Sequence, residues 1–333
     1  MTVSEVLIQG GPDPEIDPEP RTGEVAGRSP MRIAMDRLLS DRVAMVCAGI
    51  VLVFVLIAIF APLLCKLFGV EVRAGDPVTD TDSFNYPVIG PPNYGFTWEA
   101  PLGLEPNSGN DLLAEWFYGA RTSLLVASVA TVVSTIVGVV LGLISGYSRG
   151  WGDRVVTFVT DLFLTLPFLL VAIAVSPMLV ERWKENPAML DNASLIALIV
   201  ILSVFGWMGL ARLIRGEVVS LREREFIEAA RVLGMPTHRI LFRELLPNLV
   251  APIVVSFSLS LPATIAAEAT LAYLGVGVTG RPSWGQTILR AQNWFDEYPL
   301  FLYAPIVGIV VLVFALNLLG DAIRDAFDPK SFR

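Results

Sequence analysis

Long, almost uninterrupted apolar stretches are the feature that most restricts the folds open to this chain of 333 residues. About 20 apolar residues let one helix cross the hydrocarbon core of a bilayer. Lipid offers no partners for backbone polar groups, so apolar segments of this length predict helices. We therefore expect an all-α integral membrane protein whose six spanning helices lie at residues 43–65, 122–146, 155–180, 194–214, 249–275 and 301–320.

The distribution of lysine and arginine predicts which side of the membrane each connection occupies. Short connections rich in these residues remain in the cytoplasm. With six spans, both termini share one side with the connections 147–154 and 215–248, and that side holds 17 of the 24 basic residues, while the other holds 7. We therefore expect both termini to be cytoplasmic.

The same pattern divides the chain into segments. Residues 1–30 combine prolines with acidic residues and are typical of a disordered cytoplasmic tail. An interfacial helix and the first spanning helix are expected over 31–65, and an irregular extracytoplasmic cap over 66–121. The cap either shields the helix ends from water or offers aromatic and arginine side chains to an external protein. A helical core over 122–321, containing the loop 215–248, and a cytoplasmic tail over 322–333 complete the chain.

Several short motifs resemble enzyme signatures but lack the context that chemistry requires. Gly146–Gly150 matches G-x-S-x-G, yet no strand precedes it and the single histidine, His238, lies in another loop. Gly275–Gly280 matches G-x-G-x-x-G without the strand and helix of a dinucleotide site. Cys47 and Cys65 lie 18 residues apart in the first span and cannot bridge each other, and with one histidine in the chain no zinc-type ligand set is expected. None of the lysines follows a glycine as a phosphate loop demands, so any ATP hydrolysis would belong to another subunit.

Two carboxylates within the predicted spans are candidate functional groups, because ionisable residues in membranes usually mark pathways or contacts between helices. Asp161 lies in the third span and Glu268 in the fifth. Lining of a translocation path, hydrogen bonding between helices, a proton relay and solvation at the interface all remain open for them. Gly138, Gly142 and Gly146 form a face of small residues that fits either a dimer contact or internal packing.

The connection 216–248 is too long and too patterned for a passive link. Residues from Glu217 to Leu233 favour a helix, and Gly234 would end it as a left-handed cap. A second helical run is expected from Thr237 to Leu246, ending at Pro247.

Ala229 and Ala230 leave a flat patch beside Glu228 that a partner protein could approach closely. The alternative is a helix that lies on lipid headgroups through its arginines. The net charge of −8 argues against nucleic acid as a partner.

These residues resemble a known family. Glu228-Ala229-Ala230, then Gly234 and Leu245-Leu246-Pro247, is similar to the EAA loop of ABC importer permeases. Further motifs resemble the C-type permease of the dipeptide, oligopeptide and nickel importer family, namely Tyr118–Ser123, Leu164–Pro167, Pro282–Gly285, Asn317–Asp321, Arg324-Asp325 and Asp328-Pro329. The chain departs from the family at Gly103–Asp111, where the usual Gly-Thr-Asp and Gly-Arg-Asp run is altered, and in its larger insertion at 66–100.

The resemblance implies a subunit of a bacterial inner-membrane importer that translocates di- or oligopeptides, with nickel or another small solute as the alternative. Its implied partners are a B-type permease, two cytoplasmic ATPases that carry ATP and Mg, an external solute-binding protein and membrane lipid, and it implies no cofactor on this chain. The implied ATPase-docking residues are Glu228, Ala229, Ala230, Arg231 and Gly234. A secondary transporter or channel, which needs no ATPase, would predict inverted repeats.

Overall fold

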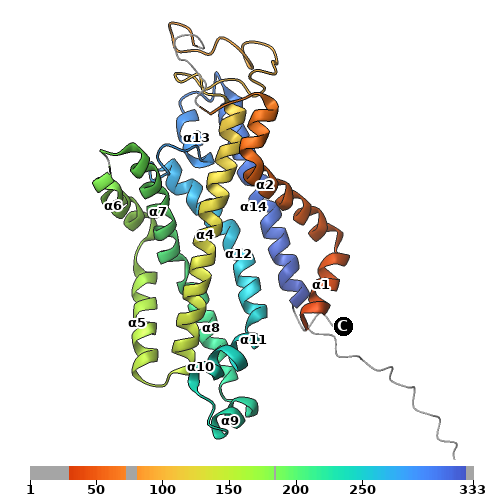
Figure 1. Ribbon diagram of the computed structural model, residues 1–333, viewed down its shortest axis with the longest axis vertical. Helices are drawn as coiled ribbons and strands as arrows, with labels where there is room; N and C mark the ends of the chain where they lie inside the picture. Colours follow the sequence, from red (N-terminus) through yellow and green to blue (C-terminus); the bar gives the residue numbers. More distant parts are fainter. Residues whose placement is uncertain (1–29, 73–80, 184, 328–333) are drawn as a thin grey trace, which may run out of the picture.

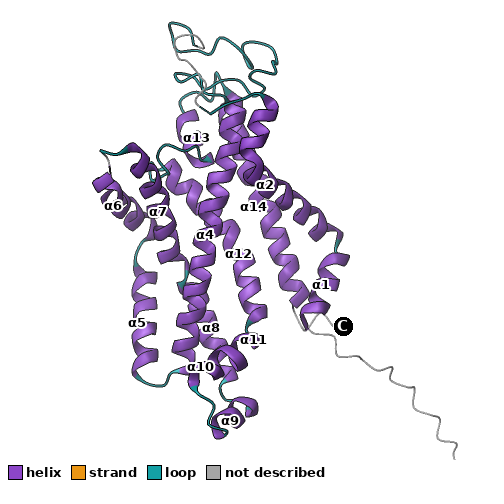
Figure 2. Ribbon diagram, viewed as in Figure 1, coloured by secondary structure: helices purple, strands orange, loops and turns teal. Residues whose placement is uncertain are grey.

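The computed structural model describes residues 30–72, 81–183 and 185–327, and its regular structure is helical over these ranges (Figures 1 and 2). Within these ranges, five helices or helix pairs are long and apolar enough to cross a membrane: α2 (Arg42–Phe68), α4 (Leu112–Tyr147), α7 (Pro187–Gly206) with α8 (Met208–Leu221), α12 (Val250–Tyr273) and α14 (Pro299–Phe327). The shorter elements are α1 (Pro30–Ser40), α5 (Trp151–Thr165), α6 (Phe168–Val180), the 3₁₀ turn η1 (Glu181–Trp183), α9 (Glu225–Val232), α10 (Thr237–Arg239), the π-helical turn η2 (Ile240–Leu245), α11 (Leu246–Asn248) and α13 (Trp284–Ala291). The all-helical class expected from the sequence is confirmed at this level.

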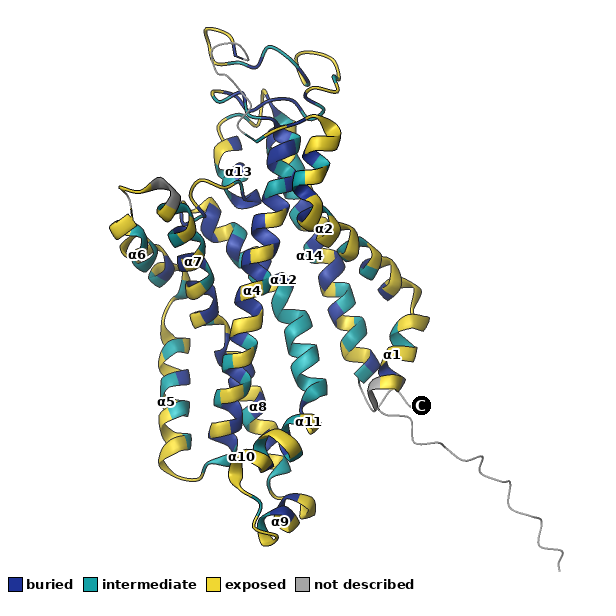
Figure 3. Cartoon of the chain, in the orientation of Figure 1, coloured by how far each residue is buried: buried dark blue, intermediate teal, exposed yellow. Residues whose placement is uncertain are grey.

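Helix α4 is the centre of the bundle. It packs against α2, α7, α8 and α12, and it is the helix in Figure 3 whose buried residues extend along most of its length. A hydrophobic core joins Ala120, Leu124 and Ala127 of α4 to Ile265 of α12 and Leu312 of α14. The outward faces of α2 and α14 keep large apolar side chains exposed, as expected for helices that contact lipid.

The glycine face of α4 packs against α8 within the same chain. A methyl group added at Gly142 would lie 2.7 Å from Cβ of Ile214, and one at Gly146 would lie 2.7 Å from Cβ of Val218. At Gly138 the nearest atom would be the carbonyl oxygen of Trp207, at 2.9 Å. The two backbones therefore approach closely because these positions have no side chain. Internal packing, one of the two alternatives left open by the sequence, accounts for this face.

The third predicted span is not one straight helix. The single helix expected over 155–180 is instead α5 and α6, which meet at 91°. Pro167 has no backbone N–H and keeps Leu166 in an extended conformation (φ −74°, ψ 129°), so the helical hydrogen bonds cannot continue through this pair. Among the described residues, five of the six predicted spans are found as helices that could cross a membrane, one of them interrupted at Trp207 between α7 and α8, and the third is a broken span or a re-entrant segment.

Helix α4 begins ten residues before the predicted start of its span at residue 122, so Leu112 to Arg121, expected in the cap, are helical. Asp111 is the reason, because its Oδ1 accepts a hydrogen bond from the N–H of Ala114 at 2.8 Å and so caps the helix. The described remainder of the cap has two isolated β-bridges, Thr81–Pro87 and Leu104–Asp111.

At the other end of the chain, α14 continues to Phe327, into the segment predicted as a tail. The predicted N-terminal tail, apart from Pro30, and residues 328–333 lie outside the described residues.

Two of the family-like motifs have structural roles. Trp284 of α13 is fully buried, and its indole N–H donates to the carbonyl oxygen of Trp116 at 3.1 Å. A methyl group at Gly119 would lie 2.8 Å from Cδ1 of Trp284, and one at Gly285 would lie 2.5 Å from the carbonyl oxygen of Ala269. Short α13 therefore wedges between α4 and α12 only because both contacts use glycine.

We expect Gly142→Ala to destabilise the protein by about 1–3 kcal/mol, because the added methyl group would force α4 and α8 apart. Gly216→Ala is the matched control, since Gly216 lies on exposed α8 surface with nothing within 4 Å of an added methyl group. Thermal unfolding in detergent measures the difference. Equal melting temperatures for the two variants would contradict the close α4–α8 contact.

Candidate functional site

The connection between α8 and α12 projects from one end of the bundle, with α9 at its tip (Figure 1). The helix expected from Glu217 to Leu233 is divided: α8 ends at Leu221, a turn covers residues 222–224, and α9 follows. The predicted cap at Gly234 is confirmed. Gly234 has a φ of 74°, its N–H donates to the carbonyl of Arg231 at 2.9 Å, and the N–H of Met235 donates to that of Ala230 at 3.0 Å.

The second helical run, predicted from Thr237 to Leu246, ends one residue after Pro247. Helical structure continues from Thr237 through the π-helical turn to Asn248, and α12 begins two residues later. Pro247 lies one residue before the end of this helical run, just after the π-helical turn, so the N–H that proline lacks costs a helical hydrogen bond only at the end of the run.

The predicted docking residues divide between two faces of α9. Ala230 is buried together with Ile227 in a hydrophobic cluster that also contains Ile240 and Leu245 from η2. Glu228, Ala229 and Gly234 are exposed. The flat patch expected around Glu228 is therefore open on one side only.

Arg231 is directed toward the bundle. Its guanidinium lies 5.1 Å from the ring centroid of Tyr147, at the end of α4, and its Nε donates to the Tyr147 hydroxyl at 3.3 Å. Arg231 therefore fixes α9 to α4 in this conformation.

Two apolar residues that the sequence reasoning missed dominate the exposed face of α9. The exposed fractions of Val232 and Leu233 are 88% and 82%, the largest among the exposed large apolar side chains of the described residues. Phe226, one helical turn and a half earlier, is also exposed. The amphipathic pattern of the helix could have predicted this exposure. Ile227 and Ala230 form its buried stripe, so the remaining apolar residues face outward.

The turn before α9 is attached to the turn between α4 and α5. Arg222 donates from Nη1 to the carbonyl oxygen of Gly146 at 2.8 Å, and Arg149 pairs with Glu223 at 2.9 Å. The first contact is partly buried, whereas the second is exposed and so contributes little to stability. With the Tyr147 contact, these bonds join the base of α9 to the C-terminal end of α4.

Helix α5 is held against α8 by ion pairs. Asp153 receives two hydrogen bonds from Arg215, at 2.7 and 2.9 Å, and Asp161 receives one from Arg212 at 2.6 Å. A polar cavity of about 260 Å³ lies between these pairs and Ser145 of α4. Asp161 and Arg212 are more than half exposed, at 53% and 56% of their side chains. Charged groups within membrane helices avoid lipid, so this face must meet water or protein.

Glu268, the other candidate carboxylate, lies inside the bundle. It is fully buried on α12, next to the hydroxyl groups of Ser123 on α4 and Ser283 before α13. Neither of its oxygens makes a hydrogen bond of good geometry. It therefore contacts neighbouring helices, not an open path, in this conformation.

A buried ion-pair cluster joins the cap to the bundle. Arg290 of α13 pairs with Glu105 of the cap at 3.2 Å and with Glu115 of α4 at 2.6 Å. Glu105 also accepts hydrogen bonds from Ser108 and Asn110. The stretch Gly103–Asp111, which departs from the family pattern, thus supplies a carboxylate that fastens the cap to α13.

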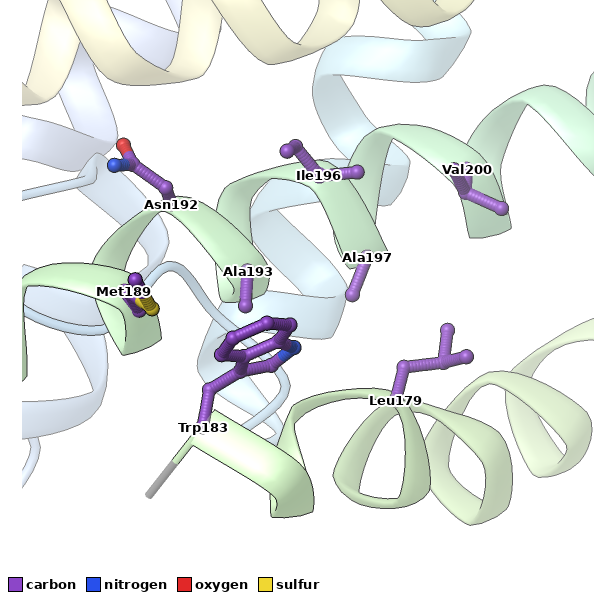
Figure 4. Close-up of a pocket in the computed structure, with 8 residues that line it drawn as sticks. All are labelled: Leu179, Trp183, Met189, Asn192, Ala193, Ile196, Ala197 and Val200. Carbon is purple, nitrogen blue, oxygen red and sulfur yellow. The ribbon is translucent and has the colours of Figure 1, made fainter. Parts of the chain in front are cut away.

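An apolar pocket of about 370 Å³ lies between α6 and α7 (Figure 4). Figure 4 shows the indole of Trp183 directed toward Ala193 and Ala197 of α7, with Leu179 beside it. The small alanines leave the space that the pocket occupies. The described residues contain no cluster of three or more His, Cys, Asp or Glu that could hold a metal ion.

The helical bundle with its projecting loop defines a multi-pass membrane transport subunit. Family models match two parts of the chain: residues 138–333 match the binding-protein-dependent transport system inner membrane component, and residues 29–71 match the N-terminal transmembrane domain of oligopeptide transport permease C. The chain therefore belongs to the family of inner-membrane components of binding-protein-dependent transport systems.

Similar proteins cover almost the whole chain. The chain is 35% identical to the dipeptide transport system permease DppC of Alkalihalophilus pseudofirmus over 95% of both chains. It is 34% identical to the oligopeptide transport system permease OppC of Escherichia coli K12, over 92% of this chain and 93% of that protein. Among solved structures, the inward-facing MetNI methionine ABC transporter matches with a TM-score of 0.51 and 21% identity, over 65% of this chain and 96% of that chain. This last match concerns the fold alone.

We expect the stability of the protein to depend on pH through Asp111, at the N-terminal end of α4. Burial raises the pKa of this carboxyl from 3.8 to about 6, because the charged form is desolvated in the folded state. The folded state therefore binds the proton more tightly, and stability is lost as pH rises from about 4 to about 6. Asp111→Asn keeps an acceptor for the Ala114 N–H without the charge.

The melting temperature of Asp111→Asn should exceed that of the wild type by an amount that grows over this pH range and then stays level. Asp111→Ala removes the cap and should lower the melting temperature at every pH. A constant difference between wild type and Asp111→Asn from pH 4 to 7 would contradict the argument.

Proposed function

We propose that this chain is the permease subunit of an ATP-driven importer that translocates di- or oligopeptides. The observation that carries the proposal is the projecting helix α9, whose buried side is fixed to α4 and α8 while Val232 and Leu233 remain exposed. The names of the relatives, which are dipeptide and oligopeptide permeases, support the peptide substrate.

Two ATPase subunits would bind ATP and Mg and dock on this subunit and on a second, B-type permease. In this arrangement the exposed face of α9, with Glu228, Ala229 and Gly234 beside the apolar pair, is the docking surface. Ala230 and Arg231 would act differently, since Ala230 packs into the cluster below α9 and Arg231 contacts Tyr147. Both chain termini would be cytoplasmic, on the same side as α9.

The close packing of α4 and α8 suggests how movement of α9 would reach the spans. Closure of the ATPases would displace α9, and α8 and α4 would follow as one body because their backbones are in contact at Gly142 and Gly146. Helix α5 would follow through the Asp153–Arg215 pair. ATP can drive this change only if it favours one conformation over the other by a difference in binding free energy.

The face that carries Asp161 and Arg212 is our candidate for the translocation path, because this exposed pair requires water or protein beside it. Glu268 would serve as a buried polar contact between α12 and its neighbours. On the opposite side of the membrane, an external solute-binding protein would deliver the substrate to the cap, where Phe84, Phe96 and Trp98 are exposed.

Removing the apolar pair of α9 should release the ATPases. We expect the double substitution Val232→Ser and Leu233→Ser to weaken ATPase retention about tenfold or more, because each buried aliphatic side chain contributes roughly 1.5–3 kcal/mol. Co-purification of the ATPases with the tagged permease measures this. Trp151→Ser is the matched control, since Trp151 is 78% exposed at the same end of the molecule but lies outside α9.

Glu228→Lys should also weaken ATPase binding, whereas Glu99→Lys, in the cap, should not. Full retention of the ATPases by both the α9 double variant and Glu228→Lys would reject the docking surface.

Cells that lack this chain should lose uptake of labelled dipeptides or of longer peptides, and complementation with the wild-type chain should restore it. Nickel uptake, measured in parallel, tests the alternative substrate. Unchanged uptake of all three solutes in the deleted strain would reject the proposed transport function.

A further inference from the structure

A groove between α2 and α14 has the features of a binding site for one lipid molecule. Its volume is about 480 Å³, and ten residues line it: Arg42, Val43, Val46, Cys47, Ile50, Val310, Val311, Phe314, Ala315 and Leu318. Nine of these lining residues are apolar or a cysteine, and Arg42 is the charged one. The groove therefore combines an apolar channel with a single positive charge.

The groove exists because the two helices pack closely along only part of their length. The outer part of α2 joins the core through Phe54 and Ala58, whereas its first turns expose Val43 and Val46 by 58% and 64%. Figure 3 shows this part of α2 largely exposed, and Figure 1 shows α1 at the same end, beside α14. Helix α1 packs on both α14 and α2, so it closes the end of the space between them.

Arg42 lies at the level where lipid headgroups are expected. It is the first residue of α2, and a helix of 27 residues is about 40 Å long, close to the thickness of a bilayer with its headgroups. The ion pairs found among the described residues do not include Arg42, which is exposed. The neighbouring Asp41 instead accepts hydrogen bonds from the N–H groups of Val43 and Ala44 as the cap of α2. An unpaired guanidinium is thus available to an anion.

We propose that this groove binds an anionic phospholipid, with one acyl chain between α2 and α14 and the phosphate on Arg42. The apolar walls disfavour water. An apolar protein helix seated in the groove would bury Arg42 without a partner, and burying an unpaired charge is unfavourable. An acyl chain would pack against the apolar walls of the groove, and a negatively charged headgroup would pair with Arg42. The cationic juxtamembrane position is one at which anionic headgroups bind other membrane proteins.

Photocrosslinking in nanodiscs tests the site in the assembled transporter. The probe is phosphatidylglycerol with a diazirine in the middle of one acyl chain, and the comparison is phosphatidylcholine with the same diazirine. We expect phosphatidylglycerol to label the peptides that contain Val46, Val310 and Phe314 about fivefold more than phosphatidylcholine, the ratio that corresponds to about 1 kcal/mol for one basic residue at an anionic surface.

Three substitutions distinguish the contribution of the lipid headgroup from that of the acyl chain in the groove. Arg42→Gln should reduce labelling by phosphatidylglycerol to the level of phosphatidylcholine, and Arg42→Lys should retain most of the difference. Val46→Trp, which fills the groove from an exposed position, should reduce labelling by both lipids. Arg154→Gln is the matched control, because Arg154 is an exposed arginine in the first turn of α5, away from the groove, and it should change nothing.

Equal labelling by the two lipids, or labelling that Arg42→Gln leaves unchanged, would overturn the proposal. Absence of label from α2 and α14, with label on a second permease subunit, would place a protein in the groove and overturn it as well. Each variant is first compared with the wild type by size-exclusion chromatography. If Arg42→Gln does not fold, the comparison of the two lipids in the wild type and the Val46→Trp variant still test the site.

Discussion

The backbone contact between α4 and α8 is the constraint on which the rest of the structure depends. Gly138, Gly142 and Gly146 allow the two helices to meet without intervening side chains, and this contact places the start of the projecting loop directly below the central helix. Dispersion contacts and close backbone approach drive such pairing, because lipid provides no hydrophobic force between helices. Such close packing favours movement of the two helices as one body, which the proposed coupling through α9 requires.

Ion pairs and hydrogen bonds of three arginines attach the shorter elements to the α4–α8 pair. Arg215 ties α5 to α8, Arg231 ties α9 to α4, and Arg290 ties α13 and the cap to α4. Each arginine joins a shorter element to the central pair. Ion pairs and hydrogen bonds are directional, so they determine the orientation of small elements that bury too little surface to be held by packing alone. The apolar surface left over is distributed between lipid-facing helices and the exposed tip of α9.

The prediction of elements from sequence succeeded where one simple physical rule dominates. The caps at Asp111 and Gly234 were readable from residue type, although only the second was used to place a helix end. The break at Pro167 was also readable, yet the apolar run across it concealed the bend, because hydropathy measures length and composition but not direction. Pro247 marked the end of the second helical run to within one residue, because proline cannot donate the N–H that would continue a helix.

The sequence by itself determined that the chain is a helical membrane protein with a projecting loop, because backbone groups in lipid must be satisfied within each helix and apolar length reports that directly. Only the tertiary structure decided which side of each helix is used. It directed Arg231 toward Tyr147, buried Ala230 and Glu268, exposed Leu233 and paired Asp161 with Arg212. These outcomes depend on contacts between residues far apart in the chain, which no local pattern encodes.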